Sequence, residues 1–224
     1  MDESERMKNQ VISKIAGRLL LRLYDRLTYN DPVQSADLIF VMAGRMERKT
    51  YGLDLYRAGV APCLLLSIGR FEISKLGKLN FGSIDELTRL RDRTRPDKRH
   101  FFLRLDASGT RIESPRLLRW NTYGEILAFR QFVEKEKVRR IIVISTDVHL
   151  RRVRLAFNNI FRSTAIEFLY CWVPPRFEFL VRERWWTRPE DRRFVIKELV
   201  KLAGYYVIVF IPEPAIRLLM RFKT

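Results

Sequence analysis

Short apolar runs alternate with segments of helical periodicity along most of this chain. Four runs are apolar at consecutive positions, as expected for strands covered on both faces: 37–43, 63–68, 141–146 and 166–171. A weaker run covers 101–105, and the intervening patterns predict helices over 45–58, 84–93, 123–137 and 149–161. This alternation predicts an α/β, Rossmann-like three-layer domain with a mostly parallel sheet.

Several helices carry a recognisable start, in which a hydroxyl residue is followed three positions later by a carboxylate. This capping-box spacing occurs at Ser83–Glu86, Thr122–Glu125 and Thr187–Glu190. The segment between 69 and 100 is strongly charged, and we interpret it as an excursion around one short helix. The helix that begins near 187 should run through 202–211 and break before Pro212, and a short basic tail follows.

The two ends of the chain differ in character from its middle. Residues 12–27 predict a helix with an apolar stripe beside a basic stripe formed by Lys14, Arg18, Arg22 and Arg26. Trp185 and Trp186 stand among arginines where the C-terminal helix begins. These terminal helices either pack on the core or contact a membrane surface, and the pattern leaves both open. We therefore divide the chain into an N-terminal helix (1–32), an α/β domain (33–175) and a C-terminal helical extension (176–224).

Charge and composition narrow the choice of partners. Among 224 residues, 43 Lys and Arg stand against 26 Asp and Glu, giving a net charge of +17. The protein should therefore attract a phosphorylated ligand, an acidic membrane leaflet or nucleic acid. No apolar run reaches the ~18–20 residues of a membrane span, so we expect a cytoplasmic protein, peripheral on the inner face of the plasma membrane if it is attached there at all.

Cysteine and histidine are scarce. The two cysteines, Cys63 and Cys171, fall inside predicted strands, which indicates buried free thiols in a reducing compartment. With only two histidines in addition, the sequence predicts no disulfide framework and no metal site. It also contains no phosphate-binding loop of the Walker type and no complete G-x-G-x-x-G. The sequence therefore does not specify a cofactor, and its identity stays unknown.

The polar residues that merit attention follow the predicted strands directly. They are Gly44, Arg45 and Arg48 after the first strand, Ser67 at the end of the second, and Ser145, Thr146, Asp147, His149 and Arg152 after the strand that begins at 141. The carboxyl ends of parallel strands meet at one edge of a sheet, where ligands bind. Helix N-termini at that edge carry positive partial charge, so the predicted ligand is anionic.

Two of these motifs together resemble a known family. Asn121-Thr122-Tyr123-Gly124-Glu125, then an apolar strand, then Thr146-Asp147-Val148-His149-Leu150-Arg151-Arg152 is similar to the paired motifs of the YdcF/SanA/ElyC-like family, domain of unknown function 218. The resemblance covers roughly 37–161, with 69–113 poorly matched. This chain has Ser-Thr where the family more often has Thr-Ser, and a single glycine in the first loop. The resemblance implies a role in bacterial envelope biogenesis.

Taken together, these patterns give candidate roles. His149, in the first turn of a helix, should stay neutral and act as an acid or base or donate to a ligand. Arg152 and Arg48 would clamp the anion. Glu125 is a second acid–base candidate, although its capping box already explains it. Asp147 is either an N-cap or a ligand contact, and the remaining ligand-binding candidates are Gly44, Arg45, Ser67, Asn121, Thr122, Ser145 and Thr146.

Three functions follow from these roles and stay open at this point. The first is an enzyme acting on a phosphorylated precursor of the bacterial envelope or cell wall. The second is a non-catalytic binder or regulator that takes a nucleotide or an S-adenosylmethionine-type ligand in the same crevice. The third, a nucleic-acid binder, is disfavoured because the basic residues are spread through helices and no known binding motif is present.

Overall fold

The computed structural model describes residues 3–69, 71–79, 84–115, 122–174, 180–211 and 214–215. The helices are α1 (Glu3–Asp25), α2 (Met46–Arg57), α3 (Ile84–Arg93), α4 (Thr122–Val133), α5 (Asp147–Ile160) and α6 (Pro189–Ile208), with short 3₁₀ turns η1 (Ile73–Lys78) and η2 (Pro96–Lys98). The strands are β1 (Leu38–Val41), β2 (Leu64–Gly69), β3 (His100–Asp106), β4 (Gly109–Glu113), β5 (Arg140–Ser145) and β6 (Glu167–Trp172).

The six strands form one sheet in the order β4-β3-β2-β1-β5-β6. Strands β2, β1, β5 and β6 are parallel, whereas β3 runs antiparallel to β2 and β4 antiparallel to β3. The predicted α/β, mostly parallel fold is therefore confirmed. From β1 the chain continues to β2 on one side and later returns to β5 on the other, which makes the carboxyl end of β1 a topological switch point.

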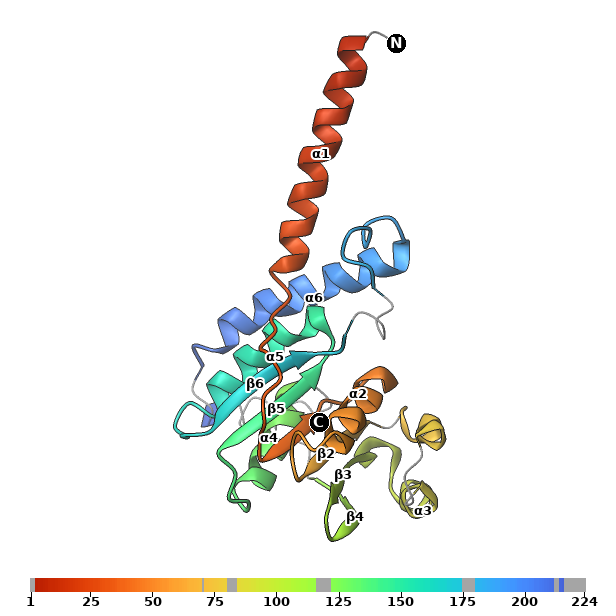
Figure 1. The fold of residues 1–224 in the computed structure, drawn as a ribbon, viewed down its shortest axis with the longest axis vertical. Helices are drawn as coiled ribbons and strands as arrows, with labels where there is room; N and C mark the ends of the chain where they lie inside the picture. Colours follow the sequence, from red (N-terminus) through yellow and green to blue (C-terminus); the bar gives the residue numbers. More distant parts are fainter. Residues whose placement is uncertain are drawn as a thin grey trace.

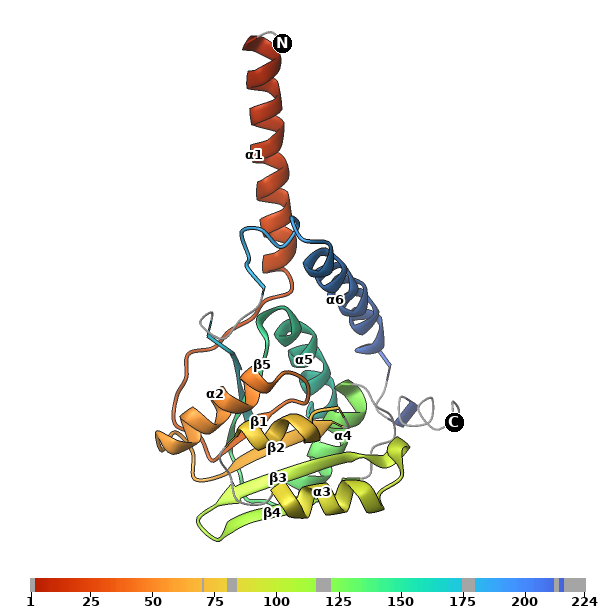
Figure 2. The same cartoon turned by 90° about the vertical axis from the view of Figure 1, so that its right-hand side faces the viewer.

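Helices cover both faces of this sheet (Figures 1 and 2). Alternate residues of β1 face opposite layers, as the two-residue period of a strand requires. Phe40 packs against Phe129 of α4 with ring centroids 3.8 Å apart, and Phe157 of α5 belongs to the same cluster. Ile39 faces the other cluster, on the side of α2 and α3. Large apolar side chains on both faces explain why β1 reads as a continuous apolar run.

One strand was not predicted, and several predicted boundaries are wrong by a few residues. Strand β4 was not predicted, because it is a partly exposed hairpin strand with no apolar run. Helix α4 ends at Val133 and not at 137. Helix α6 begins at Pro189, and the hydroxyl of Thr187 donates to the carbonyl of Arg184 instead of capping the helix. Ser83 lies outside the described residues.

Helix α1 projects from the body of the protein (Figure 1), and the chain packs on that body around the end of the helix. Tyr24 and Leu27 are buried, whereas Leu19 is 54% exposed. Trp185 is also buried and donates its indole N–H to the carbonyl of Leu20 at 3.3 Å, so this residue packs on the protein, which is one of the two alternatives that the sequence left open. No helix in the described ranges has both the length and the hydropathy that crossing a bilayer requires.

The segment between α1 and β1 runs beside β6. The backbone N–H of Asp31 donates to the carbonyl of Tyr170 at 2.8 Å, and its carboxylate accepts from the N–H of Tyr170, also at 2.8 Å. The side-chain carbonyl of Asn30 accepts from the N–H of Trp172 at 2.9 Å. These bonds tie the segment before β1 to the α/β body.

Candidate functional site

The loop after β1 is held by two carboxylates that reach it from elsewhere in the chain. The N–H of Ala43 donates to Glu125 and the N–H of Gly44 donates to Glu72, each at 2.6 Å. Glu72 also accepts from the N–H of Gly69 at 3.1 Å, which joins the loop after β1 to the end of β2. Backbone amides that we expected to face an anion are therefore occupied by the chain's own side chains.

Gly44 suits this loop because its φ of 130° lies in a region that side-chain-bearing residues rarely adopt. A Cβ there would also lie 2.9 Å from a guanidinium nitrogen of Arg48. Farther along α2, a Cβ on Gly52 would lie 2.4 Å from a methyl group of Val41. Gly44 leaves room for the guanidinium of Arg48, and Gly52 lets α2 lie directly against the end of β1.

Close packing of α2 buries a lysine that the sequence analysis missed. Lys49 is fully buried, forms an ion pair with Glu72, and donates to the carbonyl of Met42 at 3.1 Å. Burial lowers the pKa of Lys49, and the neighbouring Glu72 opposes that shift. The pair is thus a structural element that anchors the loops after β1 and β2.

Glu125 takes part in a second buried chain of hydrogen bonds. Besides accepting from Ala43, its carboxylate is hydrogen-bonded by the hydroxyl of Ser67, which lies 2.7 Å from Nε2 of His100. Burial raises the pKa of Glu125, against the effect of these hydrogen bonds. The predicted capping box is therefore wrong in its main feature, because this carboxylate reaches across to β1 and β2.

Arg48 is the most unusual charge in this region. Its guanidinium is buried and donates to the carbonyl of Ala43 at 2.5 Å and to the hydroxyl of Thr146 at 2.9 Å. Within the described part of the chain, its Nε has no hydrogen-bond partner and no carboxylate lies within ion-pair distance. Burial lowers the pKa of Arg48 to about 10, so the side chain is still cationic at neutral pH.

Arg152 is also buried, but it has a carboxylate partner. Its Nε and one terminal nitrogen donate to Glu198 of α6 at 3.0 and 2.9 Å, and its other terminal nitrogen donates to the hydroxyl of Thr122 at 2.7 Å. Lys201 binds the second oxygen of Glu198 at 2.7 Å. Helix α6, which the sequence treats as an extension, thus supplies a residue of the site.

His149 lies between these two arginines. Its Nδ1 is 2.7 Å from the hydroxyl of Ser145, and its Nε2 is 3.4 Å from that of Thr122. Burial, followed by the positive charges of Arg152 and Arg48, holds its pKa well below 6.5. The imidazole is therefore neutral, as expected, with burial as the largest cause of the shift and the two arginines next.

Asp147 is not the N-cap of α5, which was one of the two roles predicted for it. Thr146 occupies the N-cap position of α5, and Asp147 is the first helical residue. Its carboxylate accepts from the hydroxyl of Tyr24 and from the N–H of Val148. Burial raises its pKa, against the effect of the Tyr24 hydrogen bond. Asp147 therefore ties the base of α1 to the start of α5.

The structure brings most of the predicted residues to one edge of the sheet. Arg48, Thr122, Thr146, His149 and Arg152 are linked by the contacts above. Arg45 stands apart at the N-cap of α2, partly exposed and 3.9 Å from Glu47. Asn121 lies outside the described residues. Five residues of this region were not predicted, because no local pattern separates buried charged and polar residues from exposed ones: Tyr24, Lys49, Glu72, His100 and Glu198.

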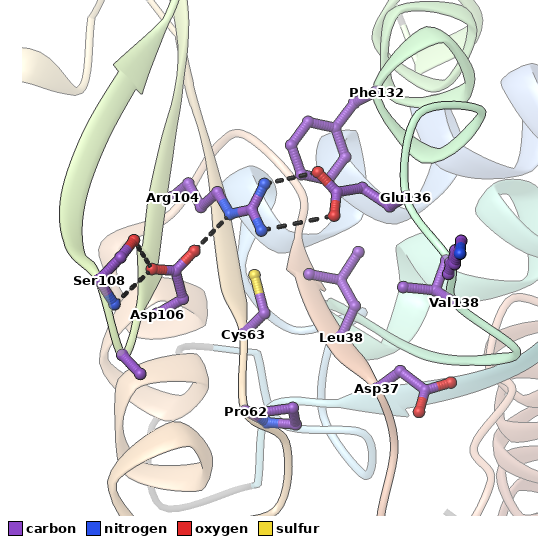
Figure 3. Close-up of a pocket in the computed structure, with 12 residues that line it drawn as sticks. Asp37, Leu38, Pro62, Cys63, Arg104, Asp106, Ser108, Phe132, Glu136 and Val138 are labelled. Atoms are coloured by element: carbon purple, nitrogen blue, oxygen red, sulfur yellow. Dashed lines mark hydrogen bonds and ion pairs between the residues drawn. The ribbon is translucent and has the colours of Figure 1, made fainter.

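Two hollows lie near the sheet ends. One, of about 300 Å³, is at the same edge as the site, and its lining includes Tyr24, Asp147, Trp172 and Leu180. The other, of about 510 Å³, lies at the opposite edge, where β1 and β2 begin (Figure 3). None of the residues predicted for the ligand site lines this second hollow.

In the hollow at the opposite edge, the guanidinium of Arg104 already has carboxylate partners. Arg104 bridges Asp106 at 2.7 Å and Glu136 at 2.5 Å (Figure 3). The thiol of Cys63 faces it, and burial raises the pKa of Cys63 to about 11. Both cysteines are free, but Cys63 is only partly buried, unlike Cys171. Among the described residues around this hollow, we find no unsatisfied polar group to point to a ligand.

Replacing His100 with glutamine should change how stability depends on pH. Burial lowers the pKa of His100 to about 4, so between pH ~6.5 and ~4 the unfolded chain binds a proton that the folded chain does not. The stability that neutral His100 contributes is therefore present above pH ~6.5 and is lost as pH falls, by up to ~3 kcal/mol. Urea unfolding of both proteins across this range should show a difference that shrinks towards pH ~4; a constant difference would contradict the assignment.

Comparisons of the chain with protein-family models, with curated proteins and with solved structures found no match.

Proposed function

We propose that the protein binds a small phosphate-bearing anion between Arg48, His149 and Arg152. The observation that carries this proposal is the state of Arg48: a buried guanidinium with no contacting carboxylate and an unpartnered Nε among the described residues. The carboxylates of Glu125, Glu72 and Glu198 stabilise the charge of Arg48 only from a distance. A buried guanidinium without a contacting carboxylate is costly, whereas a phosphate oxygen would compensate its charge directly and accept its hydrogen bond.

Two further features support an anion at this place. Burial is the largest cause of the low pKa of His149, and the positive charges of Arg152 and Arg48 lower it further, which indicates a positive potential around the imidazole. Thr122 begins α4, a helix of 12 residues, and the positive end of its dipole faces the same region. The amides of Ala43, Gly44 and Gly69 contribute nothing to an incoming anion, because carboxylates already occupy them.

The resemblance to the YdcF-like family gives this site a biological setting within the same proposal. The ligand would be a phosphorylated or nucleotide-like compound of bacterial envelope biogenesis. A neutral imidazole beside two arginines also suits acid–base chemistry on such a compound, with His149 as the group that moves a proton. Glu125 is better assigned to holding the loop after β1 than to catalysis. Non-catalytic binding of a nucleotide or of S-adenosylmethionine by the same residues is the alternative.

The proposal also locates the protein beside a membrane. Exposed basic side chains along the projecting α1 are Lys14, Arg18 and Arg22, and Arg26 is exposed just beyond its end. Each basic residue near an anionic leaflet contributes about 1 kcal/mol of attraction, which salt screens. Peripheral attachment to the inner face of the plasma membrane would follow, and the vesicle experiment described below tests it.

Replacing Arg48 with methionine should weaken phosphate binding about 10- to 100-fold, as expected for the loss of a charge-assisted hydrogen bond. Isothermal titration calorimetry of the whole chain with phosphate, pyrophosphate and ATP measures this. Arg57→Met at the exposed end of the same helix is the matched control and should bind as the wild type does. Binding of none of these anions by the wild type, or equal affinity in Arg48→Met, would contradict the proposal.

A second readout tests whether the anion binds beside His149. An anion beside His149 should raise the low pKa of its imidazole, and by linkage the anion should bind more tightly as pH falls. The chain has only two histidines, so NMR titration with and without pyrophosphate can follow both, with His100→Gln providing the assignment. The pKa of His100 should change little, because its Nε2 is engaged by the hydroxyl of Ser67 at 2.7 Å.

A further inference from the structure

A row of large apolar side chains on α6 faces away from the rest of the protein. Ile196, Val200 and Val207 are 52%, 68% and 66% exposed, and Phe210, just beyond the helix, is 87% exposed. Their spacing of four, seven and three residues places them on one stripe of the helix. Exposed Ala203 lies on the same stripe, so no polar side chain interrupts it.

The opposite side of α6 is already used. Its buried residues include Val195, Glu198 and Leu202, and it packs along α5 (Figures 1 and 2). The helix is thus apolar on two sides, of which only one is covered by the described part of the protein. A continuous apolar stripe of this kind on a protein surface marks a contact with another protein or with a membrane.

The charges around the stripe favour one of these partners. Helix α6 carries four exposed basic residues, Arg192, Arg193, Lys197 and Lys201, against one exposed acid, Glu190, because its other acids, Asp191 and Glu198, are buried. Basic side chains beside an apolar stripe complement anionic lipid headgroups above acyl chains. A symmetric contact with a second copy would instead bring eight like charges together, twice the four of one helix.

We infer that the outer face of α6 inserts into the interface of an anionic bilayer. Ile196, Val200, Val207 and Phe210 enter the acyl-chain boundary, and the flanking lysines and arginines lie among the headgroups. This inference rests on the peripheral location proposed above and names the face responsible. It also gives that face a mode of attachment, apolar insertion, that differs from the electrostatic attraction expected of α1.

The orientation has a consequence for the site. Glu198 holds Arg152 from the inner side of the same helix whose outer side meets the lipid. The thickness of one helix, about 10 Å, therefore separates the bilayer surface from the proposed anion site. The site is placed to act on a phosphate-bearing group presented at that surface.

Cosedimentation of the whole chain with vesicles tests the inference. We compare anionic vesicles, which contain phosphatidylglycerol and phosphatidylcholine, with neutral vesicles of phosphatidylcholine alone. Binding is measured at low salt and at ~1 M NaCl, where the Debye length is about 3 Å. The wild type should bind the anionic vesicles, with part of the binding surviving high salt, since salt does not screen apolar insertion. The variant Val200→Asp/Val207→Asp should partition at least about tenfold less at both salt concentrations.

The matched control replaces an exposed apolar side chain with aspartate on another face of the protein. Phe71 is 74% exposed and directly precedes η1, which packs with α3 on the side of the sheet away from α6. Phe71→Asp should bind vesicles as the wild type does. Unchanged melting temperatures of both variants would show that the fold is intact, as the exposure of the substituted positions predicts.

The outcomes separate the proposals. Equal sedimentation of the double variant and the wild type would overturn insertion of α6. Complete loss of binding at ~1 M salt would also overturn it, while leaving an electrostatic contact through α1. No binding under any condition would overturn both membrane proposals, and a dimer that the double variant abolishes would assign the face to a second copy. Phosphate binding in solution is measured without lipid, so none of these results depends on it.

Discussion

Replacing Glu72 with alanine should lower the free energy of unfolding by about 3–5 kcal/mol, the largest effect that we expect from a single substitution. The change leaves the fully buried ammonium of Lys49 without its counter-ion. It also leaves the N–H groups of Gly44 and Gly69 without their acceptor. Urea denaturation of the whole chain, followed by circular dichroism, measures the loss.

A compensating variant distinguishes this mechanism from simple loss of packing. In Lys49→Met/Glu72→Gln both charges are removed together, and the side-chain amide oxygen of the introduced glutamine can still accept from the two backbone N–H groups. Most of the stability should therefore return. A cost of less than ~1 kcal/mol for Glu72→Ala, typical of an exposed ion pair, would show that the pair does not hold the loops.

Replacing Glu198 with alanine should cost nearly as much, again about 3–5 kcal/mol. Arg152 and Glu198 are both buried, and the carboxylate accepts from two nitrogens of the guanidinium. Without it, the described part of the chain offers Arg152 only the hydroxyl of Thr122 and the face of Tyr205, whose ring centre is 5.1 Å from its guanidinium carbon. Urea denaturation again provides the measurement.

Lys201 provides the control for this pair, because it contacts the same carboxylate as Arg152. Lys201 binds the other oxygen of Glu198, but its side chain is 52% exposed, so Lys201→Met should cost no more than about 1 kcal/mol. Adding Arg152→Met to Glu198→Ala should recover stability, because the uncompensated charge is then removed. If Glu198→Ala and Lys201→Met have the same free energy of unfolding, the buried Arg152–Glu198 pair does not stabilise the packing of α6 on α5.

The sequence predicts the layered fold well because the fold depends on local patterns. Strands β1 and β5 are buried on both faces and read as unbroken apolar runs, and α5 has a clear apolar stripe. Strand β4 lacks such a pattern, since it is a partly exposed hairpin strand whose pairing depends on β3. Helix boundaries were displaced where the hydroxyl of Thr187 bonds outside its expected cap.

The candidate site could be predicted only in part. Arg48, His149 and Arg152 follow strand ends, so parallel-sheet geometry alone brings them to one edge. Their partners could not be found in this way, because Glu72 comes from a turn after β2 and Glu198 from a helix near the end of the chain. Sequence also cannot show that the amides of Ala43 and Gly44 are occupied, which changes where an anion can bind.

The hydrogen bonds between residues 30–31 and β6 bear on where the domain begins. Strand β6 is the last strand on its side of the sheet, and Asn30 and Asp31 bind backbone groups of Tyr170 and Trp172 that no other described strand pairs. Unpaired groups on an edge strand are a template for self-association. A chain shortened to begin at residue 33 would expose that edge, so the segment before β1 protects the sheet against aggregation as well as connecting it to α1.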